Sequence, residues 1–247
     1  MRLLAGLLVA LALPAAAAPS PAPAPSDPPL VAAVKKGNLQ NLQAALASGA
    51  DVNAKDQYGW TAAMWAAGHG SGPLLSALLK AGGSVAPGSA PGYDPVIEAA
   101  KGGKADVVPV LASAGLNCST KDSLGVPALA YATANVSTAT VAALLACKAD
   151  VNARDGNGYT PLIRAVQNGQ PNTVSYLLAH GARVNARDKR GYTALMWAAH
   201  DGATASAKAL LAANADASIQ GKDGFTASAI AARRGKTDVA ALLPAAP

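Results

Sequence analysis

The sequence predicts an all-α solenoid of about seven helix-turn-helix units with short β-turn fingers, extending over residues 28–247. Six glycines recur every 33 residues, at Gly59, Gly92, Gly125, Gly158, Gly191 and Gly224. Leucines recur in the same phase, at Leu78, Leu111, Leu144, Leu177, Leu210 and Leu243. A fixed period of this size indicates one supersecondary unit stacked many times, in which each unit buries its apolar face against its neighbours.

The N-terminal segment is predicted to be a signal peptide, residues 1–18, followed by a proline-alternating and alanine-rich leader, residues 19–27. Arg2 precedes an apolar run over 3–13, and small residues follow it. This run is too short to span a bilayer, and its flanks are those of a secretory signal. Alternating prolines favour an extended, unpacked leader. The alanine-rich, lysine-poor composition favours a bacterial source, so we expect secretion into the periplasm.

Each unit is predicted to open with a β-turn finger centred on the first glycine column. The fingers read Asp-Gln-Tyr-Gly-Trp-Thr-Ala at 56–62, Asp-Gly-Asn-Gly-Tyr-Thr-Pro-Leu at 155–162 and Asp-Lys-Arg-Gly-Tyr-Thr-Ala-Leu at 188–195. A closing stretch of the Gly-Ala-Asp-Val-Asn type precedes them at 49–53, 149–152 and 181–185. Aspartate in such loops is typically held by hydrogen bonds from nearby backbone amides.

Two short helices are predicted to follow each finger. The first begins at a Thr-Pro or Thr-Ala pair and ends at a second glycine column, made of Gly37, Gly70, Gly103, Gly169, Gly202 and Gly235 and interrupted at Val136. The second helix carries the leucine column and ends at Gly49, Gly82, Gly115 and Gly181, with Lys148 and Asn214 as exceptions. A helix commonly ends in a left-handed residue, which glycine and then asparagine adopt most readily.

These motifs closely resemble the ankyrin repeat, and the resemblance covers about residues 28–243. It implies a finger followed by two antiparallel helices, with fingers and first helices lining a concave face from which the family commonly contacts protein partners. The histidine of the family's Thr-Pro-Leu-His motif is absent here. Its place is taken by Met64, Ile97, Ala130, Ile163, Met196 and Ala229. The loss removes one hydrogen-bonding side chain but not the fold.

Composition and spacing argue against several other functions. The formal net charge is +6, but the basic residues are scattered and accompany no nucleic-acid-binding motif. No apolar stretch beyond the signal is long enough to cross a membrane. His69, His180 and His200 fall in separate units and do not converge on one metal. We therefore predict no catalytic residue, no metal and no cofactor, and regard a site shared with a partner subunit as the remaining route to an enzyme.

The two cysteines leave two interpretations open. Cys118 occupies the inward-facing place that Val52, Val151 and Val184 hold in other units, and Cys147 ends the second helix of the next unit. An oxidising compartment favours a disulfide between them. Such a bond needs the two Cα atoms within about 7 Å of each other. The alternative is a buried free thiol at Cys118.

Aromatic residues supply the predicted binding surface. One column follows the first glycine, at Trp60, Tyr93, Tyr159, Tyr192 and Phe225, and another lies five residues further on, at Trp65, Tyr131 and Trp197. Rings repeated at the rise of the solenoid offer contact area at low entropic cost. Basic finger residues flank them, at Arg154, Arg187, Lys189 and Arg190. Bracing of adjacent fingers is the alternative role for these rings, above all for the second column.

The sequence thus predicts a monomeric, non-catalytic module that binds another protein through the concave face, with an acidic surface on the partner. The step from fold to binding is one of family analogy. A second hypothesis has the aromatic ladder stacking on the sugars of a cell-wall glycan.

Overall fold

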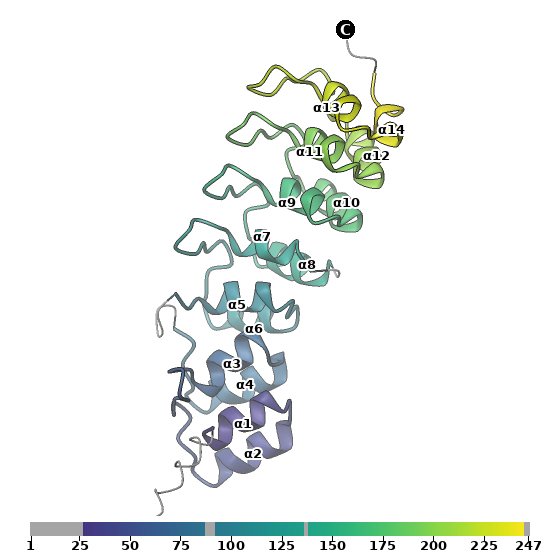
Figure 1. The fold of residues 1–247 in the computed structure, drawn as a ribbon. Helices are drawn as coiled ribbons and strands as arrows, with labels where there is room; N and C mark the ends of the chain where they lie inside the picture. The colour runs from purple at the N-terminus through teal and green to yellow at the C-terminus, as the bar shows by residue number, and fades with distance from the viewer. Residues whose placement is uncertain (1–26, 87–91, 136–137, 245–247) are drawn as a thin grey trace, which may run out of the picture.

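The computed structural model describes residues 27–86, 92–135 and 138–244. Within these ranges fourteen short α-helices form seven antiparallel pairs, stacked in one elongated array with the fingers all on one side (Figure 1). The predicted all-α solenoid is confirmed. The helices are α1 (Pro29–Lys35), α2 (Leu39–Ala47), α3 (Ala62–Gly68), α4 (Gly72–Lys80), α5 (Pro95–Lys101), α6 (Val107–Ser113), α7 (Ala128–Ala132), α8 (Ala139–Ala146), α9 (Pro161–Gln167), α10 (Pro171–Ala179), α11 (Ala194–Asp201), α12 (Thr204–Ala212), α13 (Ala227–Arg233) and α14 (Thr237–Ala240).

The predicted signal peptide and all but the last residue of the predicted leader lie outside the described residues, as do residues 87–91 of the third unit's finger and 136–137, where Val136 interrupts the glycine column. Of the fourteen helices that the structure describes, none has both the length and the apolar character needed to cross a bilayer.

The core is a continuous strip between the two layers of helices. First helices contact the first helices of neighbouring units, and most second helices do the same behind them. The leucine column supplies the centre of this strip, because Leu78, Leu111, Leu144, Leu177 and Leu210 are fully buried. Each unit therefore removes its apolar face from water only by stacking, as the period predicts.

Threonines begin four of the seven first helices. The Oγ1 atoms of Thr61, Thr160, Thr193 and Thr226 each accept a hydrogen bond of 3.3 Å from the amide three residues later. Such caps satisfy one of the amides that a helix start leaves without a partner. At two of these starts a methionine thioether also accepts from the threonine amide, Met64 at 3.4 Å and Met196 at 3.4 Å. A weak sulfur acceptor thus occupies the place of the family's histidine.

The second helices end in left-handed residues, as the glycines that follow the leucine column predict. Gly49, Gly82, Gly115 and Gly181 all have φ between 82° and 88°. Among the described residues other than glycine, only Lys148 and Asn214 have positive φ, at 63° and 60°. Asparagine tolerates this conformation, whereas the Cβ of lysine is crowded in it.

Replacing Lys148 by glycine is expected to raise the free energy of unfolding by about 0.5–1 kcal/mol, since the left-handed strain is relieved at a helix end. Urea unfolding of Lys148→Gly and of Lys148→Ala, with the disulfide intact in both, measures the effect. Alanine keeps the Cβ atom and should give no gain. An equal gain from both substitutions would show that the lysine side chain, and not its backbone conformation, causes the strain.

Asparagines in the closing loops connect each unit to the next. The side-chain amide of Asn152 donates to the carbonyl of Gly181 at 3.1 Å, and its carbonyl oxygen accepts from the amide of Arg183 at 2.8 Å. Asn53 makes the same pair of bonds to the following unit, and Asn185 accepts from the amide of Asp216. These contacts hold the fingers and helices of adjacent units in a constant register.

The junction between the third and fourth units is closed differently. Ser119 replaces the asparagine, and its hydroxyl contacts the carbonyl of Lys148 at 3.2 Å and the amide of Asp150 at 3.1 Å. One residue before it, Cys118 forms a disulfide with Cys147, whose Cα atom lies 5.9 Å away. The separation required for the bond is therefore met, and a covalent link joins two neighbouring units beside the shorter serine side chain.

Candidate functional site

The surface that the fingers and first helices share carries three columns of side chains, which we call the finger–helix face. The first column precedes the finger glycine: Tyr58, Leu124, Asn157, Arg190 and Asp223. The second follows it: Trp60, Tyr93, Val126, Tyr159, Tyr192 and Phe225. The third lies on the first helices: Trp65, Glu98, Tyr131, Arg164, Trp197 and Ile230.

A buried or half-buried aspartate organises most fingers. In the second unit one oxygen of Asp56 accepts from the amides of Tyr58 at 2.9 Å and Trp60 at 3.0 Å, while the other accepts from the indole Nε1 of Trp65 at 2.8 Å. The finger is therefore tied to the first helix of its own unit. The same arrangement joins Asp122 to Tyr131, Asp155 to Arg164 and Asp188 to Trp197.

These bonds are charge-assisted at neutral pH. Burial opposes ionisation of Asp56 and of Asp122, yet the hydrogen bonds that each carboxylate accepts hold its pKa below the ordinary value of 3.8. Reciprocally, the bond to Asp122 raises the pKa of Tyr131 to about 12. The aspartates are thus ionised and the tyrosine is protonated, which is the combination that makes the strongest hydrogen bonds.

The third column therefore has a structural role, because polar atoms of most of its side chains donate hydrogen bonds to the finger aspartates. Trp197 is only 8% exposed, and its ring offers a partner almost no area. Trp65 and Tyr131 are partly exposed, so a partner can still reach part of each ring. The sequence itself contains the signal for this pairing. A hydrogen-bond donor stands nine residues after each finger aspartate, whereas Ser89 and Gly221, which replace the aspartate, are followed by Glu98 and Ile230.

Two rings of the second column are also unavailable to a partner, contrary to the expectation for this column. Tyr93 is 4% exposed and Tyr192 is 5% exposed. Tyr93 packs against Trp60, with 5.4 Å between ring centroids. Tyr192 packs against Gly221 of the next finger, where an added Cβ atom would lie 2.7 Å from the ring, and its hydroxyl donates to Asp223 at 2.5 Å. Each ring braces one unit against a neighbour.

Trp60, Tyr159 and Phe225 remain partly exposed. Trp60 belongs to an aromatic cluster at the N-terminal end of the face. Its ring lies 5.3 Å from that of Trp65, which in turn lies 4.9 Å from the imidazole of His69. The nearby Lys35 ammonium is 4.4 Å from the centroid of Trp65.

Part of the predicted basic set forms a ladder between the fingers. The Lys121 ammonium donates to the carbonyl of Arg154 at 2.9 Å, the Arg154 guanidinium to the carbonyl of Arg187 at 2.5 Å, and the Arg187 guanidinium to the carbonyl of Gln220 at 2.5 Å. Each step spans one repeat. Arg154 and Arg187 are thus held in place by the next finger while their charge stays at the surface, and they contribute to bracing as well as to the potential of the face.

Cationic side chains also lie over three of the partly exposed rings, those of Tyr131, Tyr159 and Phe225. The Arg164 guanidinium is 4.4 Å from the centroid of Tyr159, and that of Arg233 is 4.3 Å from the centroid of Phe225. The Lys101 ammonium lies 5.1 Å from Tyr131. Cation–π contacts of this kind orient a positive charge over an aromatic surface. The face as a whole therefore presents aromatic and positive groups together.

Two exposed apolar residues were missed by the sequence-based interpretation. Tyr58 is 67% exposed and Leu124 is 75% exposed, and both stand at fingertips, immediately before the glycine. Asn157, Arg190 and Asp223 occupy the same column in later units. The period could have revealed this column, because a residue at the tip of a β-turn points away from both layers of helices.

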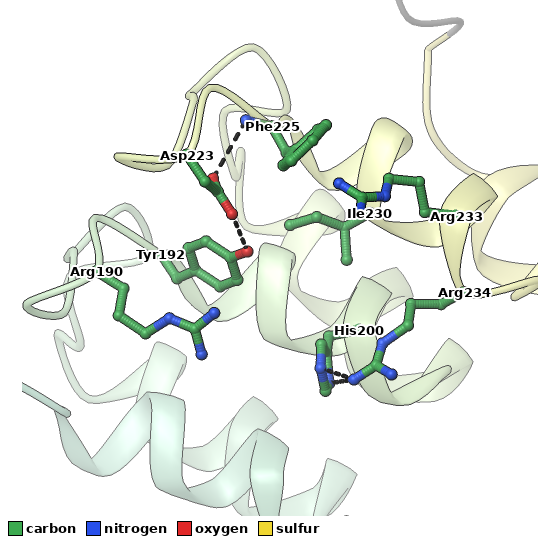
Figure 2. Close-up of a pocket in the computed structure, with 8 residues that line it drawn as sticks. All are labelled: Arg190, Tyr192, His200, Asp223, Phe225, Ile230, Arg233 and Arg234. Carbon is green, nitrogen blue, oxygen red and sulfur yellow. Dashed lines mark hydrogen bonds between the residues drawn. The ribbon is translucent and has the colours of Figure 1, made fainter.

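A hollow of about 430 Å³ opens between the last two units (Figure 2). Arg190 and Tyr192 reach it from one finger and Asp223 and Phe225 from the next. His200 reaches it from α11, Ile230 from the middle of α13, and Arg233 and Arg234 from the C-terminal end of α13. A second hollow of about 370 Å³ shares three of these residues and adds Lys189 and Lys222. The sequence predicted roles in binding for Lys189 and Arg190 but not for His200, Arg233 or Arg234.

The three histidines lie apart and each rests on a ring of its own unit: His69 on Trp65, His180 on Tyr176 and His200 on Trp197. Within residues 27–86, 92–135 and 138–244 there is no group of three histidine, cysteine, aspartate or glutamate side chains that could hold a metal ion.

The model of a family described as "Ankyrin repeats (3 copies)" matches residues 30–122, 96–188, 129–221 and 181–246. Comparison with curated proteins finds no match. The matched ranges together span every finger and both layers of helices.

Proposed function

The chain belongs to the ankyrin-repeat family, and on that premise we propose that it is a non-catalytic, monomeric module that binds an acidic protein partner through its finger–helix face in the bacterial periplasm. Ankyrin repeats are generally protein–protein interaction modules and are typically non-catalytic.

The carrying observation is that Tyr58 and Leu124 stand exposed at the tips of fingers that are held rigidly. Each of these fingers is fastened to the helix behind it by an aspartate, the first by the buried Asp56 and the second by the half-buried Asp122. Adjacent fingers further along are joined by the basic ladder. A large apolar side chain left in water on a rigid support is what a protein partner can bury at little entropic cost. The surface is preorganised, so affinity is not reduced by the ordering of loops.

The charge of the face favours an acidic partner. Lys121, Arg154 and Arg187 lie along the fingers, and Lys189 and Arg190 extend the same charge to the last units. Complementary charge accelerates encounter and disfavours basic competitors. The formal net charge of +6 acts in the same direction.

The proposed compartment has two sources of support. The N-terminal apolar segment has the pattern of a secretory signal. Cys118 and Cys147 form a disulfide, and disulfides persist in oxidising compartments such as the periplasm.

Cell-wall glycan is a second candidate ligand, favoured by the partly exposed rings of Trp60, Tyr159 and Phe225. Sugars stack on such rings, and Trp60 would report their binding through its fluorescence. A titration with cell-wall fragments that leaves the tryptophan emission unchanged, beside capture of a protein by the same preparation, would eliminate the glycan.

Removing the two exposed fingertip side chains is expected to weaken partner capture about tenfold or more, because two large apolar contacts with the partner are lost. Crosslinking in native periplasm compares Tyr58→Ser/Leu124→Ser with wild type. Tyr176→Ser is the matched control, because Tyr176 lies on α10, in the second layer of helices, and stacks on His180. Capture of the same partner at equal yield by all three proteins would refute the assignment of the face.

A further inference from the structure

The hollow between the last two units is lined by more positive than negative side chains. Arg190, Arg233 and Arg234 line it together with one acidic residue, Asp223. None of the three arginines forms an ion pair with a carboxylate in the part of the chain that the structure describes. Asp223 is instead occupied by the Tyr192 hydroxyl at 2.5 Å and the Phe225 amide at 3.3 Å.

That use of Asp223 results from a local change in the repeat. Gly221 stands where earlier fingers place the organising aspartate, and the carboxylate appears two residues later, at Asp223. There it faces the preceding unit and holds the Tyr192 hydroxyl, which lowers the pKa of Asp223. The last finger therefore contributes its carboxylate to the wall of the hollow, where the charge of Arg190 also acts on it, yet no carboxylate among the described residues forms an ion pair with any of the three arginines.

Aromatic rings fix the orientation of two of these arginines. The guanidinium of Arg190 lies 4.6 Å from the centroid of Tyr192 and 5.6 Å from that of Trp197, and the guanidinium of Arg233 lies 4.3 Å from that of Phe225. A guanidinium stacked by its face keeps its N–H groups free along its edge, where they match the two oxygens of a carboxylate. Arg234, the third, contacts the imidazole of His200 (Figure 2).

The dimensions favour a segment of chain over a small ion. The two hollows, of about 430 and 370 Å³, share Arg190, Tyr192 and Asp223, so they form one basic surface that continues from α13 to the fingertips at Lys189 and Lys222. Arg190, Arg233 and Arg234 are exposed. A single ion held by exposed side chains would be screened by salt and would bind weakly, whereas successive charges on one chain add their contacts.

We propose that this basic hollow is the subsite for an acidic segment of the protein partner, whose carboxylates are held by Arg190, Arg233 and Arg234. The inference rests on the proposed protein-binding function and deepens it. It assigns the anionic part of the partner to the last two units and the apolar part to the fingertips of Tyr58 and Leu124, so that one partner would lie along the face in a single direction.

The test uses the full chain without its signal segment and a fluorescent oligoglutamate peptide, followed by anisotropy at low ionic strength. The variant Arg233→Gln/Arg234→Gln removes two charges from the hollow. The control Lys80→Gln/Lys208→Gln removes two charges from exposed positions on α4 and α12, in the second layer of helices. We expect the affinity to fall about tenfold in the hollow variant and to change less than about twofold in the control.

An oligoglutamine peptide should not bind, and vesicles of anionic phospholipid should bind all three proteins equally or not at all. Equal losses in the two variants, binding of oligoglutamine, or a vesicle affinity that only the hollow variant loses would each overturn the proposal. Circular dichroism melts of both variants establish that they are folded.

Crosslinking in native periplasm with the same variants distinguishes failure of the proposed subsite from failure of the proposed protein-binding function. Intact partner capture by the hollow variant overturns the subsite alone. Capture that is insensitive to Tyr58→Ser/Leu124→Ser overturns the finger–helix face itself.

Discussion

Replacement of Cys118 by valine together with Cys147 by alanine is expected to lower the free energy of unfolding by roughly 3–4 kcal/mol, the loop-entropy value for a closed loop of this size. The two residues are 29 positions apart and join neighbouring units. The bond lies beside Ser119, the shorter side chain that replaces an asparagine in the closing loop. Its loss should therefore act on a junction where a serine, and not an asparagine, supplies the side-chain hydrogen bonds between the two units.

The repeat supplies the substitutions that isolate the covalent bond. Valine occupies the place of Cys118 at Val52, Val85, Val151 and Val184, and alanine that of Cys147 at Ala81, Ala114 and Ala213. Both replacements therefore fit the local packing, and cavity effects stay small.

Urea unfolding with and without dithiothreitol measures the contribution. Reductant should lower the midpoint of the wild-type protein to near that of the variant and leave the variant unchanged. A variant as stable as the oxidised wild type would mean that the closing loop and α8 already hold the junction without the bond.

Substitution of Asp188 by alanine is expected to cost about 2–4 kcal/mol, because three hydrogen-bond donors lose their acceptor. The carboxylate is 6% exposed. It accepts from the amides of Arg190 at 2.8 Å and Tyr192 at 2.8 Å and from the indole of Trp197 at 2.9 Å. The last two donors belong to buried residues, Tyr192 and Trp197, so their loss of an acceptor is costly.

Asp150→Ala is the control for this effect. Asp150 is exposed in a closing loop and accepts from the amide of Asn152 at 2.9 Å, so its loss should cost less than about 1 kcal/mol. Urea unfolding gives the two free energies, and hydrogen exchange over residues 186–192 shows whether the finger opens. Equal costs at the two positions would contradict the role assigned to the finger aspartates.

Local conformation was predictable from spacing. The glycines at the ends of the second helices predict left-handed residues, and all four adopt them, with Asn214 and even Lys148 following the same φ. The glycines of the other two columns share this conformation at nearly every position. The exception is Gly70, where a Cβ atom would lie 2.6 Å from the Cα of Ala66, so close packing and not φ requires glycine there. The Thr-Pro and Thr-Ala pairs begin first helices through side-chain caps within the same turn.

The binding surface was predictable only in part. The aromatic columns were recognised, but identical positions in the repeat differ in exposure. Tyr159 is partly exposed, whereas Tyr192 is buried because Gly221 of the next finger makes room for its ring. The exposed Tyr58 and Leu124 were missed although their place at the fingertips follows from the period. The arginines at the end of α13 were missed because the hollow that they line is formed jointly with the preceding unit.

The sequence by itself determined the period, the order of finger, helix, turn and helix, and the burial of the leucine column, because left-handed glycines, threonine caps and apolar spacing act within a few residues of one another. Tertiary structure alone decided which rings reach solvent, how Cys118 meets Cys147 and where the arginines of the last two units collect. Each of these depends on side chains about one repeat apart in sequence, whose contacts exist only once the units have stacked.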